Sequence, residues 1–304
     1  MKLKIFVLTI FFIANFYDVD AKKLPPYNFD SDTTEVKRLN EQAYQNRLTD
    51  PAQSITSAKK ALDLSQKINF IDGEAESHRV IGIGYYYLNQ RDSSLNNYLK
   101  ALSLFSNSGN LLGEAKVSNN IGNLWLEIDY DKSLFFFKKT LAIAQKFNKK
   151  ELIAGSYLNI GNAYYRKKNY TIALKNYEVS SKIFNELNNP IGITQSLQNR
   201  GVIYYSINNY EKAIEILSEA NLKAKEYELN TTVASINLTL TSCYIATGKY
   251  ELAQKYLEEG NAFAKLVSDV KKIYDDVSLL ESTSFRNQPI TTDMATLTKQ
   301  VKKF

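Results

Sequence analysis

The chain has 304 residues, of which 44% are apolar and 23% are charged, a composition typical of a folded soluble protein and not of a disordered or fibrous one. Its formal net charge is +6, but lysines and acidic residues are interspersed along the whole chain, whereas nucleic-acid-binding proteins concentrate basic residues in one stripe. We therefore expect no nucleic acid among its partners; the excess charge at most favours an acidic partner or a negatively charged membrane surface.

The first 21 residues have the pattern of an export signal. Lys2 and Lys4 precede the apolar stretch 5–16, and Val19-Asp20-Ala21 offers small residues at the cleavage positions. The apolar stretch is short for a membrane span, so a retained anchor is the alternative that we favour less. We expect cleavage after Ala21, a linker at 22–32, a secreted or periplasmic location and no transmembrane span in the mature chain.

Internal repetition is the strongest feature of the sequence. Four glycines recur at intervals of about 40 residues, and an aromatic residue follows each glycine three positions later. Further along each period, a small residue begins a stripe at steps of three and four, as on one face of a second helix. The glycines and aromatic residues are Gly82 with Tyr85, Gly122 with Trp125, Gly161 with Tyr164 and Gly201 with Tyr204; the small residues are Ser94, Ser133, Ala173, Ala213 and Ala253.

A glycine inside a helix costs about 1 kcal/mol relative to alanine, so four of them at a fixed period need a packing reason. We expect that each glycine lets the first helix approach the small residue of the second helix closely. The neighbouring aromatic residue is then expected to fill the space around this contact.

The repeat predicts six helix pairs with short breaks between helices. Asp50-Pro51 is typical of a capping residue followed by proline in the first helical position. Breaks are expected near Gly109, Asn188 and Asn208. The first pair lacks the glycine and the aromatic residue, as terminal repeats often do. The pairs lie at roughly 33–73, 74–113, 114–152, 153–192, 193–232 and 233–271.

The segment Asn159-Ile160-Gly161-Asn162-Ala163-Tyr164, followed by Tyr170 and Ala173, resembles the tetratricopeptide repeat signature. The period of about 40 residues is longer than is usual for this family, and this variety is similar to the extracytoplasmic regions of bacterial sensor kinases and regulators. The resemblance implies an all-α fold: a right-handed superhelical solenoid of about six helix pairs over 33–271, closed by a C-terminal capping helix.

In tetratricopeptide proteins, partners bind along a concave groove lined by the first helix of each pair. Side-chain amides there can pair with both the N–H and the C=O of an extended peptide, so Asn123 and Asn162 are the strongest ligand candidates. The alternative is that these amides simply belong to a solvated helix face. The candidate groove residues are Arg79, Tyr86, Asn119, Asn123, Asn162, Tyr165, Arg166, Gln198 and Tyr205.

A second asparagine ladder, at Asn120, Asn159 and Asn199, stands two residues before successive glycines. We expect it to bridge neighbouring helices more than to bind a ligand. Arg79 and Arg166 are able in principle to hold a carboxylate. His78, the only histidine, is expected to be a partly exposed helix residue.

Sequence patterns of catalysis are absent. The chain has one cysteine and one histidine, far apart, and it lacks a phosphate-binding loop, a nucleophile elbow and a zinc-protease motif. We expect no metal, no cofactor and no enzymatic activity.

At the C-terminal end a further first helix is expected to begin at Lys265, within an incomplete seventh repeat and helical tail at 272–304. This tail either caps the last pair or begins a coiled-coil stem. Two functions remain: a protein- or peptide-binding scaffold, as sensory input of a signalling system, or a structural adaptor in a cell-envelope or secretion assembly. The sequence identifies neither the ligand nor the oligomeric state.

Overall fold

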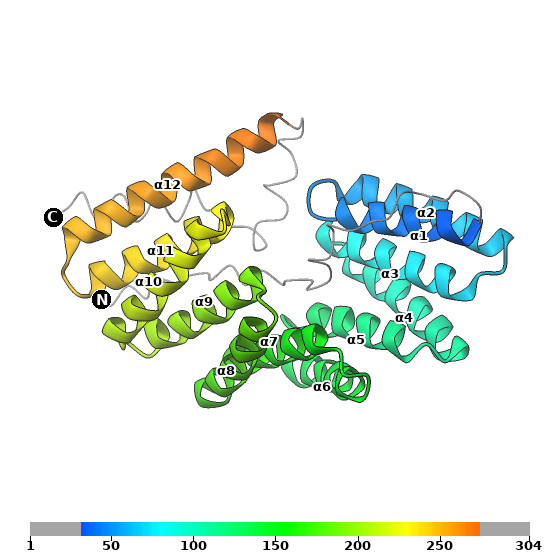
Figure 1. The fold of residues 1–304 in the computed structure, drawn as a ribbon, viewed down its shortest axis with the longest axis horizontal. Coiled ribbons are helices and arrows are strands. Elements are labelled where there is room, and N and C mark those ends of the chain that lie inside the picture. The colour runs from blue at the N-terminus through cyan, green and yellow to red at the C-terminus, as the bar shows by residue number, and fades with distance from the viewer. Residues whose placement is uncertain (1–31, 274–304) are drawn as a thin grey trace. The chain divides into compact units, whose positions relative to one another are not determined.

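The computed structural model describes residues 32–273, with side chains up to residue 262. The export signal at 1–21, the linker up to residue 31 and the tail from residue 274 lie outside the described residues. Within the described range the chain is all helical and forms twelve helices (Figure 1). They are α1 (Asp32–Gln45), α2 (Pro51–Lys67), α3 (Ile71–Tyr87), α4 (Arg91–Ser108), α5 (Leu111–Trp125), α6 (Tyr130–Lys146), α7 (Lys150–Arg166), α8 (Tyr170–Glu186), α9 (Pro190–Ser206), α10 (Tyr210–Glu226), α11 (Asn230–Ala246) and α12 (Tyr250–Ile273).

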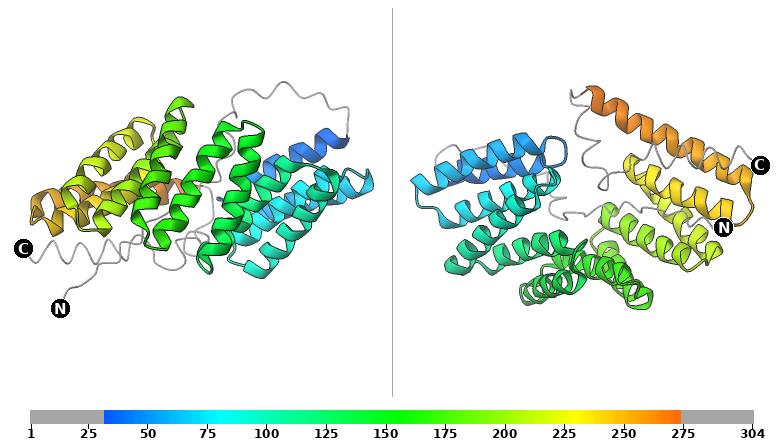
Figure 2. Two further views of the ribbon diagram at one scale, coloured as in Figure 1. Left: turned by 90° about the horizontal axis from the view of Figure 1, so that it is seen from below. Right: turned by 180° about the vertical axis from the view of Figure 1, so that it is seen from behind.

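These helices form the six predicted pairs, and they belong to two compact units that divide between Lys167 and Lys168. The first unit contains α1–α7 and the second contains α8–α12. Inside each unit, helices that follow one another in the chain pack side by side, and first helices also contact each other, α1 with α3, α3 with α5 and α9 with α11 (Figure 2). This layered arrangement of helix pairs is the predicted solenoid fold. No described helix is long and apolar enough to cross a membrane.

The repeat glycines do have a packing reason, but it differs from the predicted one. A Cβ on Gly82 would lie 2.6 Å from the Tyr98 ring of α4, and a Cβ on Gly122 would lie 2.5 Å from the Phe137 ring of α6. Gly201 faces Leu217 of α10 in the same way. The large side chain that occupies the space therefore comes from the second helix, and the prediction that the neighbouring aromatic of the first helix fills it is wrong.

The small residue of the second helix is where the two backbones meet, as expected. Ser94 Oγ donates a hydrogen bond of 2.8 Å to the carbonyl of Gly82, and Ser133 Oγ donates one of 2.9 Å to the carbonyl of Gly122. Ala213 and Ala253 are fully buried at the matching positions of the second unit, and Ala173 is fully buried in α8. A side chain larger than serine or alanine would force the paired helices apart.

Most helices end in the same tight turn. Residues at positive φ follow the helices at intervals of about 20 residues, among them Asn69, Asn89, Asn188 and Glu228. After α10, the Leu229 N–H donates to the Ala224 carbonyl at 2.8 Å and the Glu228 N–H donates to Lys225 at 3.1 Å, which satisfies carbonyls at the helix end. Asparagine tolerates this left-handed conformation better than most residues, which explains its frequency in the chain.

Glu228→Gly is expected to stabilise the second unit by up to about 1 kcal/mol, because Glu228 has φ 56° and glycine adopts this conformation without steric cost. Urea denaturation measures the change. Asn208→Gly, at φ 62°, is the matched control and should gain less, since asparagine already fits. Equal gains at both sites, or a loss at Glu228, would contradict this account.

The C-terminal end of the described range corrects one prediction. α12 runs without interruption from Tyr250 to Ile273, so no new helix begins at Lys265. The segment between them contains no proline and no turn signal strong enough to end a helix. The incomplete seventh repeat and the capping tail stay predictions, because most of that segment lies outside the described residues.

Candidate functional site

The first helices of the unit α1–α7 place one row of side chains from each helix on a common face. This row contains the positions six and three before the repeat glycine and one, four and five after it, which recur along one side of a helix. We call it the first-helix face. It consists of Glu76, Arg79, Ile83 and Tyr86 of α3, Lys116, Asn119, Asn123 and Glu127 of α5 and the turn after it, and Leu158, Asn162, Tyr165 and Arg166 of α7.

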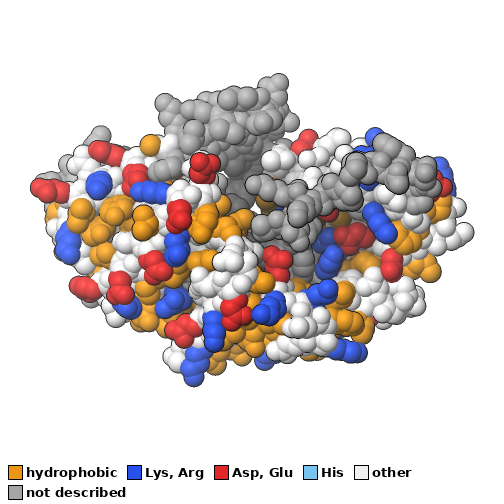
Figure 3. All heavy atoms as spheres, in the orientation of Figure 1, with side chains coloured by type: hydrophobic (Ala, Val, Ile, Leu, Met, Phe, Trp, Pro, Cys, Tyr) orange, Lys and Arg blue, Asp and Glu red, His pale blue; other side chains and the backbone are white. Residues whose placement is uncertain are grey.

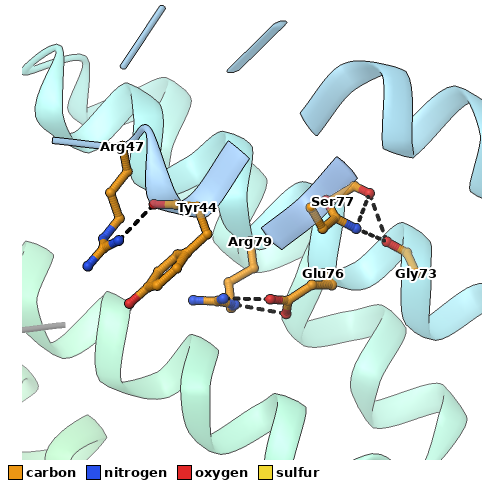
Figure 4. Close-up of polar contacts among 7 residues, drawn as sticks. Tyr44, Arg47, Gly73, Glu76, Ser77 and Arg79 are labelled. Carbon is orange, nitrogen blue, oxygen red and sulfur yellow. Dashed lines mark hydrogen bonds and ion pairs between the residues drawn. The ribbon is translucent and has the colours of Figure 1, made fainter. Parts of the chain in front are cut away.

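At the α1–α3 end of this face, an ion pair lies beside a buried tyrosine (Figure 4). Arg79 donates two hydrogen bonds to the Glu76 carboxylate, from Nε at 2.9 Å and from a terminal nitrogen at 2.5 Å. The Tyr44 ring lies between two guanidinium groups, with Arg47 at 3.7 Å and Arg79 at 5.3 Å from its centroid. Arg47 is also fixed by a 2.7 Å hydrogen bond to the Tyr44 carbonyl.

Burial and charge shift the pKa values of both acidic groups in this cluster. Burial raises the pKa of the Glu76 carboxyl, but the charge and hydrogen bonds of Arg79 and the charge of Lys116 outweigh it and lower this pKa to about 2. Burial raises the pKa of the Tyr44 hydroxyl to about 12, although the Arg47 and Arg79 cations oppose the rise. At neutral pH the cluster therefore holds a carboxylate and a neutral phenol.

Asparagine side chains join neighbouring first helices. Asn159 of α7 donates a 2.8 Å hydrogen bond to Asn119 Oδ1 of α5. Asn40, the ladder position of α1, donates to Ser77 Oγ of α3 at 3.0 Å and to the Gly73 carbonyl at 3.3 Å. These bonds are the bridging contacts that we expect of the second asparagine ladder. They also tie one candidate groove residue, Asn119, into the scaffold.

Two amides of α5 have hydrogen-bonding capacity that the protein does not use. Both polar atoms of Asn120, and Oδ1 of Asn123, are buried without a hydrogen-bond partner in the described part of the chain. Asn123 and Asn162 are only 4% and 1% exposed, so they are not simply solvated residues of a helix surface. An orphaned buried acceptor costs free energy until a partner reaches it.

At the α7 end, Arg166 donates a 2.7 Å hydrogen bond to Glu127, which lies just after α5. Both side chains are partly exposed, at 27% and 37%. Tyr86 and Tyr165 are half-buried on the same face. The face therefore combines buried amides with accessible charged and aromatic side chains.

A model of the tetratricopeptide repeat family matches residues 152–220, which include the Gly161 and Gly201 signatures. The chain contains tetratricopeptide repeats. Response regulator aspartate phosphatase I of Bacillus subtilis (strain 168) is 26% identical over 206 residues, which are 67% of this chain. The match covers 50% of that protein, so this chain spans about half the length of its curated relative.

Solved structures share the tetratricopeptide fold at low sequence identity. A Rap protein complexed with competence and sporulation factor has a TM-score of 0.62 at 17% identity, covering 90% of this chain and 77% of that one. NprR in complex with its cognate peptide NprX has a TM-score of 0.63 at 15% identity, covering 93% and 75%. The apo form of RapI has a TM-score of 0.63 at 18% identity, covering 89% of this chain and 100% of its own.

The predicted groove residues divide between the two units. Arg79, Tyr86, Asn119, Asn123, Asn162, Tyr165 and Arg166 come together on the first-helix face, whereas Gln198 and Tyr205 belong to α9. Gln198 is buried and donates a 2.8 Å hydrogen bond to Ser235 of α11. Tyr205 packs against Tyr210, with ring centroids 5.8 Å apart. These two residues remain candidates within the second unit alone.

Sequence reasoning misses Glu76, Lys116 and Tyr44. The first two stand six residues before a repeat glycine, one turn further along the stripe that holds the predicted residues, so the same periodicity could have found them. Tyr44 lies in the degenerate first pair, whose position no glycine marks. One interpretation is also wrong: His78 is buried, with Nδ1 3.0 Å from Asn97 Oδ1 of α4.

Chemistry in the described residues is limited to binding groups. No cluster of three or more metal-ligating side chains occurs among them. Burial raises the pKa of the Cys243 thiol to about 12, so this cysteine is a protonated core residue at neutral pH.

Proposed function

We propose that this chain binds a polypeptide on the first-helix face of α3, α5 and α7, and that it works as the sensory input of a signalling system outside the cytoplasm. In this proposal an extended segment of the ligand lies across the three helices. Its main-chain N–H groups donate to amide oxygens such as Asn123 Oδ1, and its side chains pack on Tyr86 and Tyr165.

The orphaned amide of Asn123 is the observation that carries the proposal. Its Oδ1 is buried without a partner, and it lies between the ion pairs Arg79–Glu76 and Arg166–Glu127, whose partly exposed charges mark the two ends of the face. Since both arginines already hold carboxylates of this chain, we assign them to the frame of the site, and the amides to ligand contact.

Similar proteins support a peptide as ligand. The structures of NprR with NprX and of the pLS20 conjugation regulator with the Phr* peptide are both peptide complexes by their names. They share the fold of this chain at 15% and 18% identity, so they support the type of ligand and not its sequence.

We propose that the activity is binding and not catalysis. The name of the Bacillus subtilis relative includes aspartate phosphatase, which identifies the reaction to test. Incubation with a phosphorylated response regulator should leave its aspartyl phosphate intact, and turnover that an acid-to-amide variant abolishes would overturn the proposal. The location rests on residues 1–21 alone; a mature N-terminus at Lys22 in an exported fraction tests it.

Asn123→Ala combined with Asn162→Ala is expected to weaken peptide binding by at least about tenfold, because two amide contacts to a peptide main chain are lost. The probes are synthetic peptides selected by the wild-type chain from a random displayed library, and fluorescence anisotropy measures their affinity. Asn107→Ala, an exposed asparagine of α4, is the matched control. Circular dichroism checks that each variant is folded.

Unchanged affinity in the folded double variant would show that the first-helix face is not the binding site. A selection that yields no specific peptide would contradict the choice of ligand. Equal losses in the double variant and in the Asn107→Ala control would point to a general effect and would also reject the site.

A further inference from the structure

The solvent face of α6 combines lysines with one prominent phenylalanine. Exposed positions follow at steps of three and four from Lys132 through Phe135, Lys138 and Ala142 to Lys146. Phe135 is 64% exposed. Lys132 pairs with Asp129 at 3.4 Å, whereas Lys138 and Lys146 have no acidic partner among the described residues. This face is positive and has an apolar centre.

The solvent face of α10 is its opposite in charge. Glu211, Glu215, Glu219 and Glu226 follow one another along the helix, and Leu222, which is 70% exposed, lies between the last two. Glu215 pairs with Lys212 at 2.7 Å. The other three glutamates have no basic partner in the part of the chain that the structure describes. This face is negative and also has an apolar centre.

The two faces match residue by residue when the helices are set antiparallel. α6 and α10 both have 17 residues. With Phe135 opposite Leu222, Lys138 stands opposite Glu219 and Lys146 opposite Glu211. Lys132 then lies beside Glu226 at the other end. Each free lysine therefore faces a free glutamate around one apolar contact.

The equivalent faces of other second helices do not segregate their charges. On α8, exposed Lys175, Glu178 and Lys182 alternate in sign, and on α4 the exposed Asn96 and Lys100 carry no such pattern. On the molecular face seen in Figure 3, lysine, arginine and acidic side chains are likewise interspersed. The separation of charge on α6 and α10 is thus specific to these two helices.

We propose that this chain self-associates, with the α6 face of one copy packed antiparallel on the α10 face of a second copy. The occupant is a second copy because sign, spacing and apolar centre of the two faces fit each other. The contact is heterologous, so two copies that exchange both contacts close a dimer, and copies that exchange one form a longer chain. This association uses the outer faces of second helices and is independent of the proposed peptide site.

Association is expected to be reversible and sensitive to salt, because exposed ion pairs are weak and are screened within about 10 Å at 0.1 M salt. Sedimentation of the purified chain over a range of concentrations should show a mass above the monomer at about 0.05 M salt and mostly monomer at about 0.5 M. The variants Lys138→Glu/Lys146→Glu and Glu211→Lys/Glu219→Lys should each associate at least about tenfold more weakly. Lys59→Glu/Lys60→Glu, on the exposed side of α2, is the charge-matched control.

Mixing the two reversed variants provides the decisive measurement. Each variant repels its own copies, but the new glutamates of one face the new lysines of the other, so an equimolar mixture should regain the association of the wild type. A wild-type chain that stays monomeric at low salt at every concentration would overturn the proposal. So would equal weakening by the Lys59/Lys60 control, or a mixture of folded variants that fails to associate.

Discussion

Gly122→Ala is expected to destabilise the unit α1–α7 by about 1–3 kcal/mol, although alanine is the better helix former. The added Cβ would lie 2.5 Å from Cε1 and 2.6 Å from Cδ1 of Phe137, whose side chain is fully buried in α6. The ring cannot withdraw, because Ser133 holds the two helices together through its 2.9 Å hydrogen bond to the Gly122 carbonyl. Urea denaturation followed by circular dichroism measures the loss.

A double-mutant cycle separates this clash from other effects of the substitution. Phe137→Ala alone should cost about 3–5 kcal/mol, since it empties a fully buried position. Adding Gly122→Ala to Phe137→Ala should then be neutral or stabilising by up to about 1 kcal/mol, because the ring is gone and helix propensity remains. If Gly122→Ala costs the same in both backgrounds, the glycine does not exist to receive the ring.

The helix pairs could be predicted from sequence because each pair repeats local signals. Gly82, Gly122 and Gly201 mark first helices, and asparagines such as Asn188 mark the turns between helices. What filled the space beside each glycine could not be read from spacing alone. Tyr98, Phe137 and Leu217 differ in type and lie on another helix, so only the three-dimensional pairing shows that they share one role.

The site was predictable in position and less so in its interactions. Periodicity placed Asn123, Asn162 and Arg166 on one face, but it could not show that Asn119 bonds Asn159 across α5 and α7. A contact between residues 40 positions apart depends on which helices are neighbours. Glu76 was missed for the opposite reason: its partner Arg79 is local, but a glutamate on an amphipathic helix carries no sign of burial.

Glu76→Gln is expected to destabilise the unit α1–α7 by about 2 kcal/mol at neutral pH, because the Arg79 guanidinium would lose its counter-charge. The Arg79 side chain is only 4% exposed, whereas that of Glu76 is 27% exposed. The lowered pKa of about 2 against the ordinary 4.5 would correspond to at most about 3 kcal/mol, and partial exposure reduces this figure. Glu41→Gln, whose carboxylate contacts only neutral Gln45, is the matched control and should change stability by less than about 0.5 kcal/mol.

The effect of Glu76 must also depend on pH in a defined direction. A carboxyl whose pKa is lower in the folded state than in the unfolded chain binds its proton first in the unfolded chain, so it stabilises the fold fully above about pH 4.5. That contribution is lost as the pH falls from 4.5 to about 2. The difference in unfolding free energy between the wild type and Glu76→Gln should therefore be constant from neutral pH down to about 5 and shrink steadily below it. A difference that stays constant through this acid range would mean that Glu76 acts through its size and hydrogen bonds, and not through the charge that it presents to Arg79.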